Sequence, residues 1–171
     1  MACIFLIGFM ASGKSSVGRR LSELTGAYFT DMDTEIERRE RMPIHRIFSQ
    51  KGEAPFRGLE TALLHEIGET CSEKRHIVAT GGGLPCTDDN INYMNNRGVT
   101  VYLKVSIDDI VSRVEQSRKR PVFHRIGSRE GLEELLGARE PFYRRAHIQI
   151  ENSNSVSVEH RAELLARILG L

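Results

Sequence analysis

Lysine, cysteine and long hydrophobic runs are all scarce in this 171-residue sequence. No hydrophobic stretch approaches the roughly 18 residues that a helix needs to cross a lipid bilayer, so we predict no membrane span. The amino-terminal residues 1–8 carry no basic group ahead of their hydrophobic stretch, which argues against a secretory signal peptide. These absences together favour a cytoplasmic protein.

The few cysteines are widely scattered. The sequence contains three, Cys3, Cys71 and Cys86, and none belongs to a C-x-x-C pair. An odd number of cysteines at such spacing is atypical of a disulfide framework or a zinc site. We therefore expect three buried or unreactive free thiols, as in a protein of a reducing compartment.

Net charge is also small, because 24 Lys and Arg residues face 23 Asp and Glu residues. A protein without a global positive field has no general attraction for nucleic acid or for an anionic membrane surface, so we predict neither partner. Among the 24 cations, however, 19 are arginine and only 5 are lysine. The planar guanidinium group suits carboxylates and phosphates better than an ammonium group does, so this bias needs an explanation.

Short hydrophobic strands alternate with amphipathic helices along the chain. The expected strands are 3–7, 27–31, 76–80, 99–105 and 147–150, and the expected helices are 14–25, 34–41, 53–71, 88–96, 107–116, 130–137 and 158–169. Such alternation is typical of an α/β domain with a mainly parallel sheet. The length fits one domain, 1–171, and no linker-like segment divides it.

A glycine-rich loop follows the first expected strand. Its residues Gly8–Ser15 match the pattern G-x-x-x-x-G-K-[ST] at every fixed position. Backbone N–H groups of such a loop bind phosphate oxygens, the lysine bridges the β- and γ-phosphates, and the hydroxyl group ligates Mg²⁺. The alternative is a simple glycine turn that caps a helix. The residues expected at the triphosphate are Gly8, Ala11, Ser12, Gly13, Lys14, Ser15 and Ser16.

Acidic and glycine-rich segments follow the second and third expected strands, at the edge where open α/β sheets bind ligands. Asp31 and Asp33 could support Mg²⁺ through water and serve a phosphoryl-accepting hydroxyl group, although Asp33 could instead cap the next helix. The run Gly81-Gly82-Gly83 could offer N–H groups to an anion or form an ordinary flexible turn.

Two groups of arginines are candidates for binding an anion. Arg57 and Glu60 are i, i+3 neighbours on an expected helix, where they could simply pair with each other. Residues 113–145 contain eight arginines and one lysine against five glutamates. Within that stretch, the polar segment 117–129 has the composition of a mobile lid whose cations close on a triphosphate. A solvated basic surface is the usual alternative.

The ordered series of these motifs resembles the shikimate kinase family over nearly the whole chain. The series consists of Gly8–Ser15, Asp31-x-Asp33, Phe56-Arg57-Gly58-Leu59-Glu60, Gly81-Gly82-Gly83, Arg120-Pro121 and Arg139-Glu140-Pro141-Phe142-Tyr143. The resemblance implies a P-loop kinase fold, which is a three-layer sandwich around a five-stranded parallel sheet of order 2-3-1-4-5. It also implies transfer of the γ-phosphoryl group of ATP to the 3-hydroxyl group of shikimate, in the biosynthesis of aromatic amino acids.

The same resemblance assigns roles around the transferred group. Asp33 would hold the acceptor hydroxyl groups and act as the base. Lys14 and Arg120, the latter from the lid, would bind the ATP phosphates and neutralise charge. Ser15 would ligate Mg²⁺, the implied cofactor, and Asp31 would support it through water.

The resemblance also places the acceptor substrate. Arg57 and Arg139 would clamp its carboxylate, and Glu60 would orient Arg57. The implied backbone contacts come from Gly81, Gly82 and Gly83. The loop that contacts adenine would fall near 152–156, where the sequence is too plain to assign residues.

Two other interpretations remain open from the sequence. A kinase of gluconate or of a nucleoside monophosphate could use the same scaffold. A nucleotide-gated binding module would bind nucleotide without acceptor-dependent turnover, but neither an N-K-x-D guanine motif nor a separate effector region supports it. We expect a monomer, because no exposed apolar stripe indicates an interface.

Overall fold

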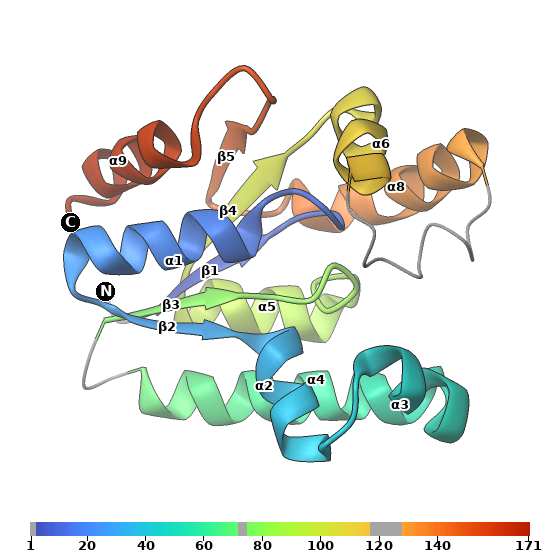
Figure 1. Ribbon diagram of the computed structural model, residues 1–171. Helices are drawn as coiled ribbons and strands as arrows, with labels where there is room; N and C mark the ends of the chain where they lie inside the picture. The colour runs from blue at the N-terminus through green and yellow to red at the C-terminus, as the bar shows by residue number, and fades with distance from the viewer. Residues whose placement is uncertain (1–2, 72–74, 117–127) are drawn as a thin grey trace.

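The computed structural model describes residues 3–71, 75–116 and 128–171 (Figure 1). A central sheet is formed by β1 (Cys3–Ile7), β2 (Tyr28–Asp31), β3 (His76–Ala79), β4 (Gly98–Lys104) and β5 (Ile148–Glu151). All neighbouring strands are parallel, and the strand order is β2-β3-β1-β4-β5. The predicted parallel sheet and its order are therefore confirmed.

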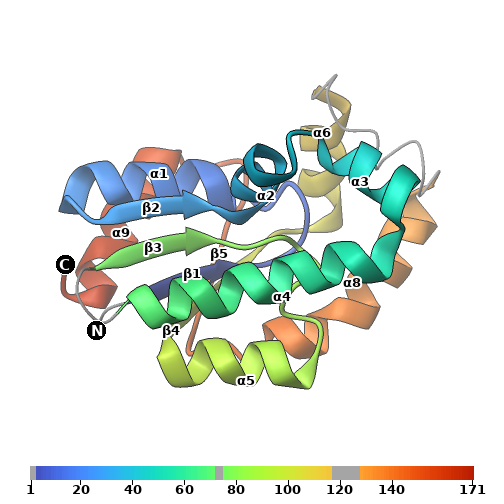
Figure 2. The same ribbon diagram turned by 90° about the horizontal axis from the view of Figure 1, so that it is seen from below.

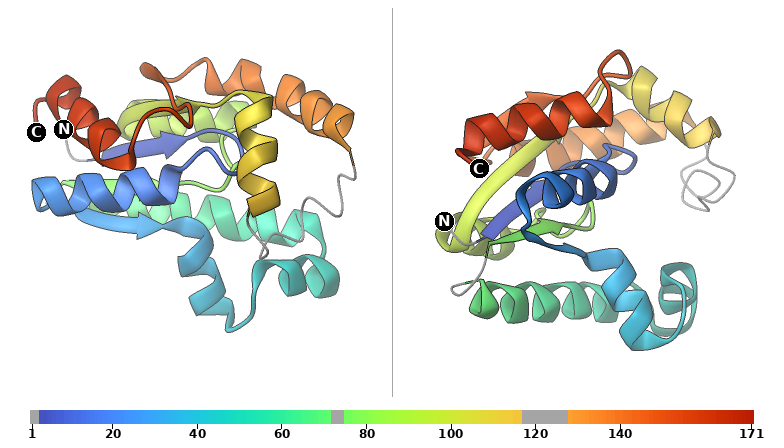
Figure 3. Two further views of the ribbon diagram at one scale, coloured as in Figure 1. Left: turned by 45° about the horizontal axis from the view of Figure 1, so that its top comes forward. Right: turned by 60° about the vertical axis from the view of Figure 1, so that its left-hand side comes forward.

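Helices cover both faces of the sheet and give three layers (Figure 2). On one face, α1 (Lys14–Thr25) and α9 (Val158–Leu169) pack together. The other face carries α4 (Glu53–Thr70), α5 (Asp88–Arg97) and α8 (Arg129–Tyr143). Beyond the carboxyl ends of the strands lie α2 (Met32–Glu40), α3 (Ile44–Lys51) and α6 (Ile107–Gln116), as Figures 1 and 3 show. No helix of the described residues is long and apolar enough to span a membrane.

Strand β1 is buried on both of its faces. Cys3, Phe5 and Ile7 belong to the core under α4, α5 and α8, whereas Ile4 and Leu6 belong to the core under α1 and α9. A central strand covered on both sides consists of continuous hydrophobic residues. The hydrophobic run ends at Gly8, and β1 ends at Ile7 as the sequence predicts, immediately before the glycine-rich loop.

Helix α8 is longer than the sequence predicts. The expected helix ended at residue 137, but α8 continues to Tyr143 with Pro141 inside it. A proline removes one backbone hydrogen bond and is expected to end or kink a helix. Here the buried side chains of Leu132 and Tyr143 hold the two ends of the helix against the core, so packing outweighs the local preference. Arg139 and Tyr143 consequently lie one turn apart on the same helix face.

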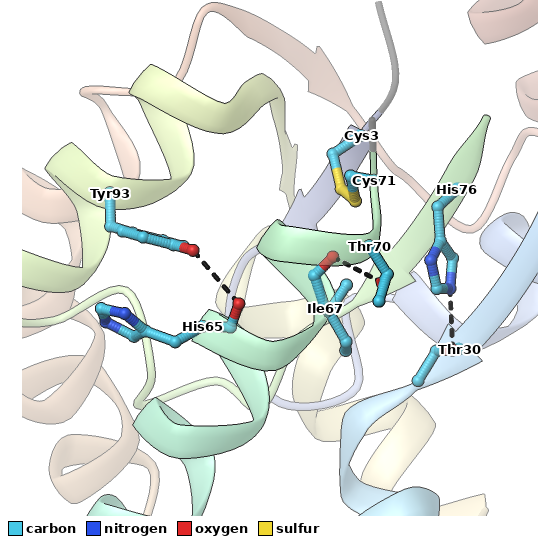
Figure 4. Close-up of a disulfide and its surroundings, with 8 residues drawn as sticks. All are labelled: Cys3, Thr30, His65, Ile67, Thr70, Cys71, His76 and Tyr93. Atoms are coloured by element: carbon cyan, nitrogen blue, oxygen red, sulfur yellow. Dashed lines mark hydrogen bonds between the residues drawn. A yellow bond between two sulfur atoms is a disulfide. The ribbon is translucent and has the colours of Figure 1, made fainter. Parts of the chain in front are cut away.

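Cys3 and Cys71 form a disulfide between the start of β1 and the end of α4 (Figure 4). Their Cα atoms lie 5.4 Å apart, within the usual range for a disulfide. The prediction of three free thiols is therefore wrong for this pair and is confirmed only for Cys86. The two residues are separated by 68 positions, and sequence spacing cannot show that the fold brings them together.

Candidate active site

The glycine-rich loop joins the end of β1 to the start of α1. Gly8 and Gly13 have φ angles of 140° and 85°, in the region that favours glycine. Ala11 also has a positive φ, 58°, which is unusual for a residue with a side chain. A Cβ atom on Gly8 would lie 2.8 Å from the carbonyl oxygen of Leu103, so β4 leaves no room for another residue. The loop is thus a closely packed cradle at a helix N-terminus, where backbone N–H groups bind phosphate.

Lys14 folds back into this loop. Its ammonium group donates to the carbonyl oxygens of Gly8 at 2.9 Å and Phe9 at 2.8 Å, and to Ser12 Oγ at 3.2 Å. The residue is only 8% exposed, and these oxygens offset the cost of removing its charge from water. Phosphate oxygens carry a larger negative charge than carbonyl oxygens, so a triphosphate can compete for the same N–H donors.

Ser15 and Asp31 meet at the mouth of the loop. Ser15 Oγ donates a hydrogen bond to Asp31 Oδ2, and Asp31 Oδ1 accepts one from the backbone N–H of Thr34 at 3.1 Å. Asp31 is therefore the cap of α2, so the alternative that Asp33 caps this helix is wrong. Hydroxyl and carboxylate oxygens are the ligands that Mg²⁺ prefers, and these two residues fit such an ion.

This oxygen pair does not make a complete metal site. Within the described part of the chain, no group of three or more His, Cys, Asp or Glu side chains could hold a metal ion. Mg²⁺ is commonly held by one or two protein oxygens together with substrate phosphates. The arrangement fits that second kind of site, beside the phosphate loop.

Asp33 and Glu60 approach the backbone of Gly81. A Cβ atom on Gly81 would lie 3.0 Å from Asp33 Oδ1 and would overlap Glu60 Oε1. Burial and the nearby carboxylate of Asp31 raise the pKa of Asp33 above its ordinary value, whereas the ammonium group of Lys14 lowers it. A raised pKa makes the ionised carboxylate a stronger proton acceptor.

Glu60 is buried between charged neighbours. It is 1% exposed, and its Oε2 accepts a hydrogen bond from Arg57 Nη1 at 2.5 Å. Burial raises the pKa of Glu60 to about 7, with Arg57 and Arg139 acting in the opposite direction. Its second oxygen, Oε1, has no hydrogen-bond partner among the described residues. The carboxylate thus lies within the electrostatic reach of both predicted substrate-clamping arginines.

Arg57 and Arg139 lie against the glycine loop formed by Gly81, Gly82 and Gly83. A Cβ atom on Gly83 would overlap the guanidinium group of Arg57, and one on Gly82 would lie 3.6 Å from Arg139 Nη1. Arg139 Cζ also lies 5.8 Å from the centre of the Phe9 ring. Two guanidinium groups close to one backbone segment form a suitable place for a carboxylate.

Side chains lie close to the backbone of the glycine loop, and this explains the glycine at Gly81 and Gly83. None of Gly81, Gly82 and Gly83 adopts a left-handed φ, so backbone conformation does not demand glycine here. Side chains from α2 and α4 occupy the space that Cβ atoms on Gly81 and Gly83 would need, whereas a Cβ atom on Gly82 would make ordinary contacts at 3.5 Å or more. The alternative of an ordinary flexible turn therefore does not account for Gly81 and Gly83.

The remaining predicted site residue, Arg120, lies outside the described residues. So does most of the expected lid at 117–129, of which Ser128 caps α8 and Arg129 begins it. Ser16 follows Ser15 in the first turn of α1 and is exposed. The structure thus brings together the phosphate loop, the two aspartates, the glycine loop, Arg57 and Arg139 at one edge of the sheet.

A cavity of about 310 Å³ opens beside the phosphate loop. Arg113 crosses it, donating to the carbonyl oxygens of Ala11 at 2.9 Å and Asn152 at 2.6 Å, and to Asn154 Oδ1 at 2.7 Å. Two buried atoms, Asn152 Oδ1 and Arg161 Nε, lack hydrogen-bond partners among the described residues. The lining comprises Ala11, Gly13, Ser16, Val17, Arg113, Asn152, Asn154, Val156, Val158 and Arg161.

Sequence reasoning missed Arg113 and Arg161. Each lies on an amphipathic helix, α6 or α9, where an arginine is ordinarily solvent-exposed. In the structure, burial lowers the pKa of both guanidinium groups. The only signal in the sequence was the short polar segment 152–156, three of whose residues line the cavity.

Comparison with known proteins separates this chain from other kinases of similar fold. The family model described as shikimate kinase matches residues 10–169. The shikimate kinase of Parabacteroides distasonis is 41% identical over 155 residues, 88% of each chain. That of Acinetobacter baumannii is 36% identical over 167 residues, 97% of this chain and 91% of the relative.

Solved structures agree with the sequence relatives. Shikimate kinase from Bacteroides thetaiotaomicron superposes with a TM-score of 0.87 at 32% identity, covering 99% of both chains. A shikimate kinase from Acinetobacter baumannii in complex with shikimate gives a TM-score of 0.88 at 37% identity, covering 99% of this chain and 94% of that one.

A more distant structure helps to place these similarities. A gluconokinase from Sinorhizobium meliloti has a TM-score of 0.56 at 19% identity, covering 99% of this chain and 95% of that one, and shares the fold alone. By contrast, the shikimate kinase family model spans residues 10–169, a range that includes Asp33, Arg57 and Arg139. The chain therefore belongs to the shikimate kinase family and is an ATP-dependent kinase.

Proposed function

We propose that this protein transfers the γ-phosphoryl group of ATP to the 3-hydroxyl group of shikimate. One set of the residues described above binds ATP, and another set binds shikimate. The supporting observation is the convergence of Asp33, Arg57 and Arg139 on the glycine loop, next to the phosphate loop. A hydroxylated carboxylic acid needs both features, a carboxylate beside its reacting hydroxyl group and cations for its own carboxylate.

The nucleotide end uses the phosphate loop. Lys14 exchanges its bonds to the carbonyl oxygens of Gly8 and Phe9 for bonds to the β- and γ-phosphates, where its charge is better compensated. Backbone N–H groups at the start of α1 add positive potential. Mg²⁺, held by Ser15 Oγ and supported by Asp31 through water, supplies charge neutralisation on the phosphates when bound.

The cavity beside the loop accommodates the nucleoside part of ATP. Its volume of about 310 Å³ lies at the lower end of the range for small-molecule pockets. Among the described residues, the acceptor Asn152 Oδ1 and the donor Arg161 Nε have no hydrogen-bond partner, and hydrogen-bonding groups of a nucleobase can satisfy them. Arg113 joins the phosphate loop to the segment 152–154 and so holds one side of the cavity in place.

The acceptor end uses Asp33 and the arginines. Asp33 accepts the hydrogen bond of the 3-hydroxyl group and takes its proton as the new oxygen–phosphorus bond forms. Arg57, held by Glu60 at 2.5 Å, and Arg139 bind the carboxylate, while N–H groups of the glycine loop fix the ring. Arg120 neutralises charge on the transferred group; this role rests on the family resemblance.

A panel of acceptors tests this proposal. ADP release from Mg·ATP is measured with shikimate, gluconate, nucleoside monophosphates or no acceptor, and ³¹P NMR locates the phosphate in the product. We expect turnover only with shikimate and a product phosphorylated at the 3-position. Turnover with gluconate or a nucleoside monophosphate instead would assign another acceptor, and nucleotide binding without turnover on any acceptor would favour a binding module.

The proposal includes the setting of the reaction. We place a monomeric enzyme in the cytoplasm, with ATP and shikimate as its substrates and no nucleic acid or membrane partner. The net charge of +1 supports the absence of polyanionic partners. Sedimentation velocity tests the oligomeric state, and fractionation of cells tests the location.

A further inference from the structure

Tyr143 ends the Arg139–Tyr143 motif, and the proposed mechanism gives it no role. Its side chain is 0% exposed, and its ring packs against that of Tyr102 with the ring centres 5.2 Å apart. A buried tyrosine places its hydroxyl group where a hydrogen-bond partner is available. The partners of this hydroxyl group are therefore informative.

The Tyr143 hydroxyl group meets two parts of the substrate site. It donates a hydrogen bond to the carbonyl oxygen of Gly82 at 2.5 Å. The guanidinium group of Arg139 and the thiol of Cys86 interact with the same hydroxyl group. Burial raises the pKa of Tyr143, so the hydroxyl group keeps its proton and remains a donor. One buried hydroxyl group thus bonds to the glycine loop and lies within the electrostatic reach of a clamping arginine.

The bond to Gly82 also sets the direction of the next backbone donor. The carbonyl group of Gly82 and the N–H group of Gly83 belong to one planar trans peptide and point in opposite directions. Because Tyr143 draws the carbonyl oxygen toward α8, the N–H group of Gly83 turns away from α8. Arg57 covers Gly83 closely, so this residue lies between the two arginine-bearing helices.

We propose that Tyr143 is a positioning residue for the acceptor substrate. Through its hydroxyl group it couples α8, which carries Arg139 one turn earlier, to the glycine loop. The guanidinium group of Arg139 and the N–H group of Gly83 are thereby held in a fixed relative orientation. This inference rests on the proposed function for the identity of the acceptor, although the coupling itself does not depend on turnover.

The test is the variant Tyr143→Phe, which keeps the ring and removes the hydroxyl group. We expect the KM for shikimate to rise about tenfold, because the Gly82 carbonyl group loses the hydroxyl donor of Tyr143 and the contact that remains, from the thiol of Cys86 at 3.6 Å, is weak, while the Kd for ATP stays unchanged. The matched control is Tyr102→Phe, which removes the hydroxyl group of the neighbouring ring and should leave the KM unchanged.

A second measurement separates positioning from general stability. In protein labelled with ¹³C and ¹⁵N, Tyr143→Phe should shift the carbonyl carbon of Gly82 and the amide nitrogen of Gly83, and Tyr102→Phe should shift neither. This readout needs no turnover, so it stays valid if another acceptor replaces shikimate. A double-mutant cycle with Arg139→Ala should be non-additive, since Tyr143 is proposed to act partly by holding the guanidinium group of Arg139 in place.

Two results would overturn the inference. One is a shikimate KM for Tyr143→Phe within twofold of the wild type, whether or not the melting temperature falls. The other is an equal rise of KM in Tyr143→Phe and Tyr102→Phe, which would assign the effect to the packing of the tyrosine pair. If Tyr143→Phe does not fold, the hydroxyl proton of Tyr143 is followed in wild-type protein with ¹³C-labelled tyrosine, and exchange with solvent as fast as that of an exposed tyrosine would contradict the hydroxyl contact.

Discussion

At the scale of single residues, two carboxyl groups with raised pKa values lie close to one another. Burial is the largest cause for both Asp33 and Glu60, and the carboxylate of Asp33 also raises the pKa of Glu60. The two carboxylates have different neighbours. Glu60 is bound to Arg57 at 2.5 Å, whereas Asp33 lies near Lys14 and Gly81. One carboxylate is thus placed to orient an arginine and the other to meet a substrate.

Asp33→Asn tests the second assignment. The amide keeps the shape of the side chain but cannot accept a proton, so we expect kcat to fall by about 10²-fold or more. The Kd for ATP, measured by calorimetry on the same variant, should change little because the phosphate loop is untouched. Near-normal kcat would reduce Asp33 to a group that only positions the acceptor.

Glu60→Gln tests the effect of burial on pH dependence. The folded pKa of Glu60 is about 7 and the reference value is 4.5, so the native state binds the proton more tightly than the unfolded chain does. Stability therefore increases as pH falls from above 7 toward 4.5 and decreases as pH rises through that window. When the pH is lowered from 8 to 5, the free energy of unfolding of the wild type should increase by up to about 3 kcal/mol relative to that of Glu60→Gln.

The comparison with the variant is necessary because other groups titrate in the same window. Burial lowers the pKa of His76, so its protonation at acid pH acts in the opposite direction, but equally in both proteins. Denaturant unfolding at several pH values gives the difference directly. A constant difference from pH 8 to pH 5 would contradict the raised pKa of Glu60.

At the scale of elements, the glycine loop is the place where α2, α4 and α8 come together. Gly81 makes room for Asp33 and Glu60, and Gly83 makes room for Arg57. Gly82 is different, since its nearest neighbours would lie 3.5 Å or more from a Cβ atom. Gly81 and Gly83 therefore leave space that neighbouring side chains occupy, and Gly82 does not. The sequence alone does not show this difference.

Three alanine variants test this distinction. Gly81→Ala should lower the free energy of unfolding by about 1–3 kcal/mol, because the added methyl group displaces the buried carboxylate of Glu60. Gly83→Ala should mainly raise the KM for shikimate, because it displaces the guanidinium group of the partly exposed Arg57. Gly82→Ala should unfold at nearly the wild-type temperature. The measurements are thermal unfolding and acceptor kinetics, and equal effects at all three positions would refute the steric explanation.

At the scale of the whole molecule, the Cys3–Cys71 disulfide ties the first strand to the end of the longest helix (Figure 4). Both residues are buried, at 0% and 2% exposure. The crosslink encloses the phosphate loop, both aspartates and Arg57 within one closed segment of chain. It therefore restricts the unfolded state of the half of the protein that carries most of the site.

Reduction should destabilise the protein measurably. For a separation of 68 residues, the chain-entropy model gives a contribution of about 4 kcal/mol. We expect denaturant unfolding with and without dithiothreitol to differ by up to this amount in the wild type and in Cys86→Ala. The double variant Cys3→Ala/Cys71→Ala should not respond to the reductant. Three alkylatable thiols in the unreduced wild type would contradict the disulfide.

The order of strands and helices and the position of the phosphate loop were determined by the sequence itself. The local hydrophobic pattern predicts each element, as a continuous run in β1 and as helical spacing in α1. The phosphate loop needs Gly8 and Gly13 because of their positive φ angles. Only the tertiary structure decided the Cys3–Cys71 pairing, the end of α8 at Tyr143 and the burial of Arg113. Each depends on groups far apart in the chain, whose contacts form only when the sheet brings them together, so no local pattern can encode them.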